Sequence, residues 1–137
     1  MRAAGGPGII PFELAGPRRS AEILRHWGAE GQRAARASLL LDFPYLVAYT
    51  TLNVRITRRA RDSAPFHRLR PAVAGIQVAA GACDAVENAA LLGVIARGGD
   101  ARLASLARAA ARAKFAGLVL GWVFGGAAVP GILTGGE

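Results

Sequence analysis

Three polar residues that could support proton transfer, ion binding or ion pairing, Asp84, Glu87 and Asn88, lie within the otherwise apolar segment 72–96. Neighbouring carboxyl groups can share a proton, bind a cation or pair with a basic side chain. A segment of this length can cross a bilayer, where ionisable groups are costly. The sequence therefore predicts an integral membrane protein with a polar site at mid-depth.

The cost of these acids predicts that segment 72–96 needs partners. Two acids near the centre of a spanning helix cost roughly +5 to +7 kcal/mol on an insertion scale. The eight Val, Ile and Leu residues of the segment return only about −2.4 to −4.8 kcal/mol on that scale. We therefore expect it to insert with neighbouring helices, its acids protonated or paired. Lys114, the lysine that begins another apolar run, is the expected partner.

Further polar residues recur at helical spacing in two apolar segments, which places each set on one helix face. The candidate intramembrane polar cluster comprises Asp42, Tyr45, Tyr49, Gln77, Asp84, Glu87, Asn88 and Lys114. Gly117, Gly121 and Gly125 form a ridge with four-residue spacing, which allows close helix approach. We interpret this helix-packing ridge as a seam within the chain rather than as a dimer motif.

These residues have to be positioned by an all-α fold, an integral membrane bundle of three transmembrane helices with an N-terminal interfacial helix. Pro44 should kink the first span or free a carbonyl, Pro71 should close a basic connector over 55–70, and Asp100 is a good helix N-cap. We expect one domain over 1–137, with a tail at 1–16, an interfacial helix at 17–28 and spans at 37–54, 72–96 and 109–129.

The composition excludes several classes of function. Hydrophobic residues make up 53 % of the chain, and the net charge of +8 lies mainly between or beside apolar segments. Such a pattern is typical of loops and helix ends in membrane proteins, so we expect no nucleic-acid partner. The lone Cys83 excludes an internal disulfide and a cysteine-based zinc site. His26 and His67 show no metal-ligand spacing, so we expect no metal and no cofactor.

Several short motifs resemble a group of small, uncharacterised bacterial multi-pass membrane proteins. The matching features are Phe12-Glu13, Trp27-Gly28, Leu41-Asp42-Phe43 with Tyr49, Asp84-Ala85-Val86-Glu87-Asn88 and Lys114-Phe115. The resemblance spans most of the chain and implies a membrane protein with an acidic pair and a lysine. It brings no activity with it.

Three functions fit these features. The first is a non-catalytic membrane protein whose polar cluster specifies helix packing or binds a partner, and this is the function we expect. The second is a proton- or ion-linked transporter or channel component that titrates Asp84 and Glu87. The third is a small interfacial lipid-modifying enzyme, with Asp42 joining these two acids to bind a metal or activate a hydroxyl.

We expect the protein in the inner (plasma) membrane, as a multi-pass protein. Its partners would be membrane lipids and either further copies of the chain or another membrane protein. Five arginines between positions 18 and 36 and four between 97 and 112 would lie on one side of the membrane, against six in the 55–70 connector. This count favours a cytoplasmic N-terminus, whereas the charge density of the connector argues the other way.

Overall fold

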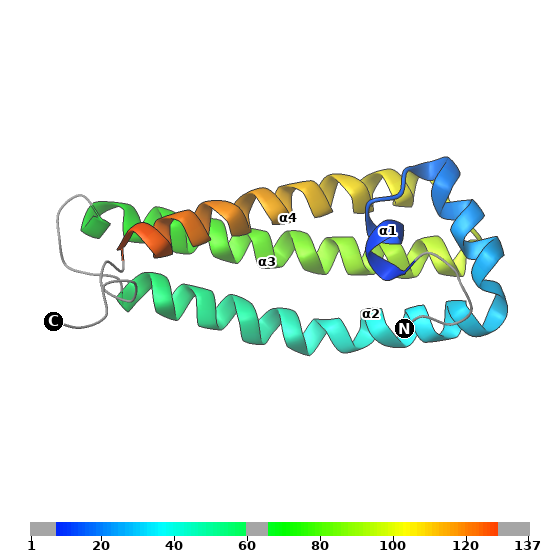
Figure 1. Ribbon diagram of the computed structural model, residues 1–137, viewed down its shortest axis with the longest axis horizontal. Helices are drawn as coiled ribbons and strands as arrows, with labels where there is room; N and C mark the ends of the chain where they lie inside the picture. Colours follow the sequence, from blue (N-terminus) through cyan, green and yellow to red (C-terminus); the bar gives the residue numbers. More distant parts are fainter. Residues whose placement is uncertain (1–7, 60–65, 129–137) are drawn as a thin grey trace, which may run out of the picture.

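The computed structural model describes residues 8–59 and 66–128, and every element in these ranges is a helix, which confirms the all-α prediction. The elements are α1 (Ile9–Glu13), α2 (Pro17–Arg59), α3 (Phe66–Ala96) and α4 (Ala101–Ala128). The three long helices lie side by side, and α3 packs against both α4 and α2 (Figure 1). Successive long helices run in opposite directions, so distant parts of the chain meet at the same depth.

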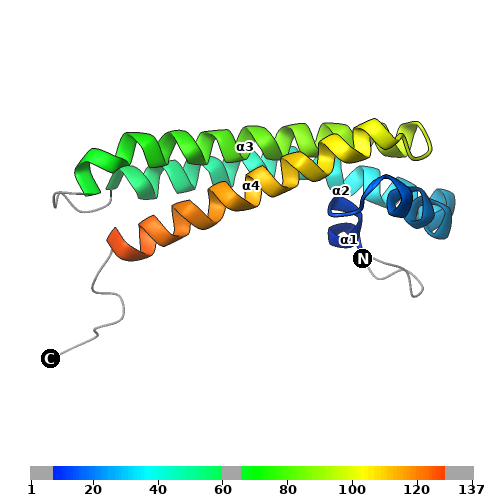
Figure 2. The same ribbon diagram turned by 90° about the horizontal axis from the view of Figure 1, so that it is seen from above.

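The short helix α1 corrects the expectation of an extended tail for Ile9–Glu13, while residues 1–7 of the expected tail lie outside the described residues. Local sequence argues against a helix here because Gly8 and Pro11 oppose one. Tertiary packing overrides that preference: the Phe12 side chain is 0 % exposed and its ring centroid lies 4.9 Å from that of Trp27. Figure 2 shows α1 beside the first part of α2, at one end of the bundle.

Helix α2 changes direction at Gly28, where the predicted interfacial helix ends. Gly28 has φ 61° and ψ −169°, a left-handed conformation that is strained for residues with a side chain. The segment before Gly28 turns away from the long part of α2 (Figure 1). Pro44, in contrast, does not interrupt α2. The residue with non-helical backbone angles inside this helix is Gly28.

Helix α3 begins earlier than expected, at Phe66, and takes in Pro71 within its second turn. The predicted 55–70 connector is correspondingly shorter, because α2 continues to Arg59. At its other end α3 turns into α4 through Gly98 and Gly99, which have φ of 64° and 107°. Asp100 then caps α4, as predicted: its Oδ1 accepts hydrogen bonds from the backbone N–H groups of Arg102 (2.9 Å) and Leu103 (3.1 Å).

One helix in the described part of the chain, α3, is long and apolar enough over His67–Ala96 to cross a membrane. The apolar parts of α2 and α4 contain Asp42, Arg112 and Lys114, which lower their hydropathy. A core helix of a soluble bundle can share the length and composition of α3. What distinguishes the two cases is which side chains face inwards and which face outwards.

Candidate functional site

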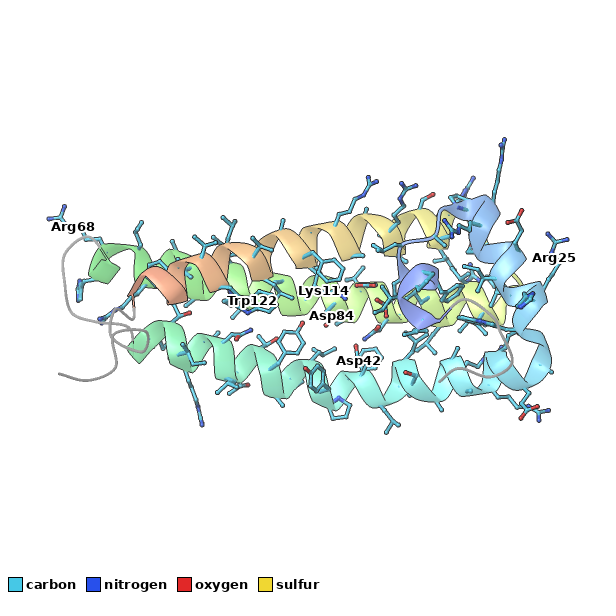
Figure 3. The ribbon with its side chains drawn as sticks, in the orientation of Figure 1. Arg25, Asp42, Arg68, Asp84, Lys114 and Trp122 are labelled. Carbon is cyan, nitrogen blue, oxygen red and sulfur yellow. The ribbon has the colours of Figure 1, made fainter. Side chains whose placement is uncertain are left out.

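Lys114 of α4 forms ion pairs with two acids of α3. Its Nζ lies 3.0 Å from Asp84 Oδ1 and 2.6 Å from Glu87 Oε2. All three side chains are buried, and Glu87 is 0 % exposed. The predicted pairing of Lys114 with these acids is therefore present, and it lies between the long helices in the middle of the molecule (Figure 3).

Helix α2 reaches the same cluster through two hydrogen bonds. The Tyr49 hydroxyl donates to Asp84 Oδ2 at 2.6 Å, and the Asn88 Nδ2 group donates to Asp42 Oδ2 at 2.7 Å. Each of the three long helices thus contributes at least one polar side chain. We use the name polar cluster for Asp42, Tyr49, Asp84, Glu87, Asn88 and Lys114.

Two residues of the predicted set lie outside the polar cluster. Tyr45 is 65 % exposed, although its ring centroid is 5.5 Å from that of Tyr49. At 3.6 residues per turn, Tyr49 lies about 20° around the helix from Asp42, whereas Tyr45 lies about 60° away and points outwards. Gln77 is buried further along α3, where its Nε2 donates to the Gly117 carbonyl oxygen at 3.3 Å.

The glycines allow the three helices to approach closely enough for these contacts. A Cβ added at Gly117 would lie 2.9 Å from Ala80 Cβ of α3. A Cβ added at Gly121 would overlap Gln77, and one at Gly81 would overlap Thr50 of α2. Gly125 also lies in α4, but its surroundings fall outside the described side chains. The first two ridge glycines therefore pack against α3 within the same chain.

Charges in the polar cluster do not balance. Three carboxyl groups, from Asp42, Asp84 and Glu87, accompany the single ammonium of Lys114. Glu87 Oε1 is buried and has no hydrogen-bond partner among the described residues. Its Oε2 lies 2.6 Å from Lys114 Nζ, in the ion pair. An uncompensated buried charge is expensive, so the excess of carboxyl groups over the one ammonium group is the unusual feature of this cluster.

Glu13 of α1 is a fourth acid near the cluster, and our reading of the sequence did not include it among the site residues. Burial raises the pKa of Glu13 above its ordinary value; the positive charge of Lys114 opposes this shift, and the carboxyl groups of Asp42 and Asp84 add to it. The available signal was the Phe12-Glu13 motif, but a residue in an expected tail gave no reason to place it beside the spans.

The cluster does not resemble a metal centre. Among the described residues no three His, Cys, Asp or Glu side chains are placed to hold a metal ion. The Lys114 ammonium occupies the position between Asp84 and Glu87 that a bridging cation would need. The arrangement can hold helices in register, and it can gain or release protons.

Comparison of the chain with protein-family models, with curated proteins and with solved structures found no match. The function is therefore inferred from two physical features. One is the polar cluster, and the other is the distribution of apolar side chains on the outside of the bundle.

Proposed function

We propose that this chain is a multi-pass membrane protein with spans at 37–54, 72–96 and 109–129, and that its polar cluster fixes the three helices in register. The observation that carries the proposal is that charged side chains are buried between the long helices while large apolar side chains are exposed. Glu87 and Lys114 are buried, whereas Leu41 is 72 % exposed and Trp122 is 65 % exposed. A soluble helical bundle has the opposite distribution.

Large exposed apolar side chains follow the outer faces of all three long helices. They comprise Leu40, Leu41, Val47, Leu52 and Ile56 of α2, Leu69, Val78 and Val86 of α3, and Leu106, Phe115, Val119, Leu120, Trp122 and Val123 of α4. A water-soluble monomer rarely exposes so many large apolar side chains. Surrounding lipid would cover them.

In lipid, association of helices depends on close packing and on polar contacts between them. The polar cluster supplies contacts between α3 and α4 through Lys114, and between α2 and α3 through Tyr49 and Asn88. Slipping one helix by a turn would leave these groups without partners. This supports a structural or partner-binding role rather than catalysis.

Cysteine labelling tests the membrane proposal. In a chain with Cys83 replaced by Ala, His67→Cys and Arg102→Cys each place a thiol at an exposed position on either side of the α3 span. We expect an impermeant maleimide to label position 67 in right-side-out vesicles and position 102 in inverted vesicles. Equal labelling of both sites in either vesicle type, or loss of the protein on alkaline extraction, would contradict a span between them.

Substitutions at the ion pair test the structural role. Lys114→Met leaves two buried acids without a counter-charge, and Glu87→Gln removes one of those acids, so the double variant should be more stable than the sum of the single effects predicts. We expect a coupling free energy of about 0.5–3 kcal/mol. Arg112→Met, which removes an exposed cation of the same helix, serves as the control. If the effects of Lys114→Met and Glu87→Gln on stability were strictly additive, this ion pair would not fix the register of the helices.

A proton-linked transport function is the second candidate, and the excess of acids over Lys114 favours it. Reconstituted in liposomes, the wild-type chain would then carry protons down an imposed pH gradient, and Glu87→Gln would abolish the flux while the protein stayed folded. Proton flux that is equal in wild type, Glu87→Gln and empty liposomes would exclude this candidate.

A further inference from the structure

A pocket of about 580 Å³ lies between the last turns of α2 and the first turns of α3. Two arginines, Arg58 of α2 and Arg70 of α3, line it together with the apolar side chains of Val54, Ala74 and Val78. The pocket shares no residue with the polar cluster and lies nearer to the end of α2 and the start of α3. It combines guanidinium groups with an apolar wall.

The surroundings of the pocket are strongly basic. The described ranges 54–59 and 66–83 contain no Asp or Glu, and no described acid lines the pocket. Arg55 and Arg68 are exposed in the same two stretches. Arg68 lies at the same end of the molecule as the pocket, and Arg25 lies at the opposite end (Figure 3). An anion that enters this pocket would therefore meet the positive charges of Arg58 and Arg70.

The depth of the pocket matches a lipid headgroup. Val54 is the last residue of the proposed first span, and the second span begins just after Pro71. The arginines lie on the aqueous side of this boundary, while Ala74 and Val78 lie on the apolar side. Basic pockets between spanning helices can hold anionic lipid headgroups. With the cytoplasmic N-terminus expected from the sequence, this pocket would face the outer leaflet.

We propose that this pocket binds the phosphodiester headgroup of an anionic phospholipid, with the acyl chains lying along α3. The planar guanidinium groups of Arg58 and Arg70 would donate paired hydrogen bonds to the phosphate oxygens. The apolar side chains favour a lipid over free phosphate, which would leave Val54, Ala74 and Val78 uncovered. The choice of a lipid depends on the proposed membrane location.

The test is a titration of phosphatidylglycerol into the full chain in neutral detergent micelles, followed by native mass spectrometry. We expect Arg58→Gln with Arg70→Gln to raise the dissociation constant roughly tenfold or more, since two charge-assisted contacts are lost. The matched control is Arg25→Gln with Arg33→Gln, which removes two exposed arginines elsewhere on α2 and should leave binding unchanged. Equal weakening in both double variants would overturn the proposal.

A second variant blocks the pocket without changing charge. A Cβ at Gly75 meets no atom within 4 Å, so Gly75→Leu should project into the pocket and keep the fold, which circular dichroism would check. We expect Gly75→Leu to weaken phosphatidylglycerol binding at least fivefold, whereas Ala89→Leu, at an exposed position of α3 far from the pocket, should leave it unchanged. Unaltered binding to a folded Gly75→Leu protein would overturn the assignment of this pocket.

Two further measurements distinguish the source of the phosphate. Phosphatidylcholine should bind at least tenfold more weakly than phosphatidylglycerol, and millimolar inorganic phosphate should not displace the lipid. Displacement by inorganic phosphate, or equal binding of both lipids, would overturn an anionic-lipid site. Because these measurements are made in micelles, their result is independent of the vesicle labelling that tests the spans.

Discussion

Where α3 turns into α4, the helices close over a continuous apolar core, whereas at the opposite end α2 and α3 leave the arginine-lined pocket between them. Phe12, Leu24, Leu91 and Val94 belong to that core, which we call the closed end. The open end is the region around Arg58 and Arg70. The closed end is packed like the interior of a soluble protein, and it includes α1 and the segment before Gly28.

The difference indicates that the two ends of the bundle have different roles. At the closed end, helix ends are capped and loops are short, and Arg36 Nη2 donates to the Ile95 carbonyl oxygen at 3.4 Å. At the open end, the described helices approach each other without a comparable core. Stability should therefore reside at the closed end, and adaptable binding at the open end. Four substitutions test this difference, in order of expected effect.

The largest effect is expected from Phe12→Ala at the closed end. Removing a fully buried aromatic side chain that packs on Trp27 should lower the free energy of unfolding by about 3–5 kcal/mol. Chemical unfolding in detergent, followed by circular dichroism, measures this change. Ile10→Ala, two residues away and largely exposed, is the control. Similar losses in both variants would show that α1 does not contribute to a specific core.

A smaller loss is expected from Gly99→Ala in the turn between α3 and α4. Gly99 has φ 107°, and an added Cβ would lie 3.0 Å from Ala21 Cβ, so the substitution combines backbone strain with a close contact. We expect Gly99→Ala to lower the free energy of unfolding by about 1–2 kcal/mol. The same unfolding measurement applies, and a neutral result would indicate that the turn can adopt another conformation.

The opposite sign is expected from Gly75→Ala at the open end. Here the helical backbone accepts a side chain and no atom lies within 4 Å of the new Cβ. Replacing Gly by Ala within a helix should stabilise the protein by roughly 0.5–1 kcal/mol. A destabilised Gly75→Ala variant would show that the open end is as tightly packed as the closed end.

The smallest effect concerns the pH dependence of the α4 cap. Hydrogen bonds from the backbone N–H groups of Leu103 and Arg102 hold the pKa of Asp100 below its ordinary value. An acid with a lowered pKa stabilises the folded state above its unfolded pKa, and this contribution is lost as the pH falls through the lowered value. Asp100→Asn should therefore show a weaker acid dependence of stability than wild type. Identical acid dependence in the two proteins would contradict this role.

The cost of buried charge predicted the contacts of the polar cluster better than helical periodicity did. Lys114 was predicted to pair with the acids of segment 72–96, and these ion pairs are present. Tyr45 was placed with Tyr49 because a spacing of four residues is compatible with one face, but its 65 % exposure depends on the angle at which α2 meets α3.

The remaining differences have a similar cause. Helix α1 could not be predicted because tertiary burial of Phe12 overrides the local preference of Gly8 and Pro11. The pocket could not be predicted either, because the sequence places Arg58 and Arg70 in a solvated connector. In the structure, α2 and α3 extend into this connector and bring the two arginines together. Whether three helices span a membrane stays a prediction, which the labelling experiment tests.

The ion pair of Lys114 with Asp84 joins residues 30 positions apart, and this has a consequence for biosynthesis. As the chain emerges from the ribosome, α3 is complete before its counter-charge has been translated. If α3 spans a membrane as proposed, its acids are then costly to place in lipid. We expect α3 and α4 to enter the bilayer together as a hairpin, so that chains truncated before Lys114 fail to resist alkaline extraction. Completion of the last helix would then act as the checkpoint that commits the nascent protein to the membrane.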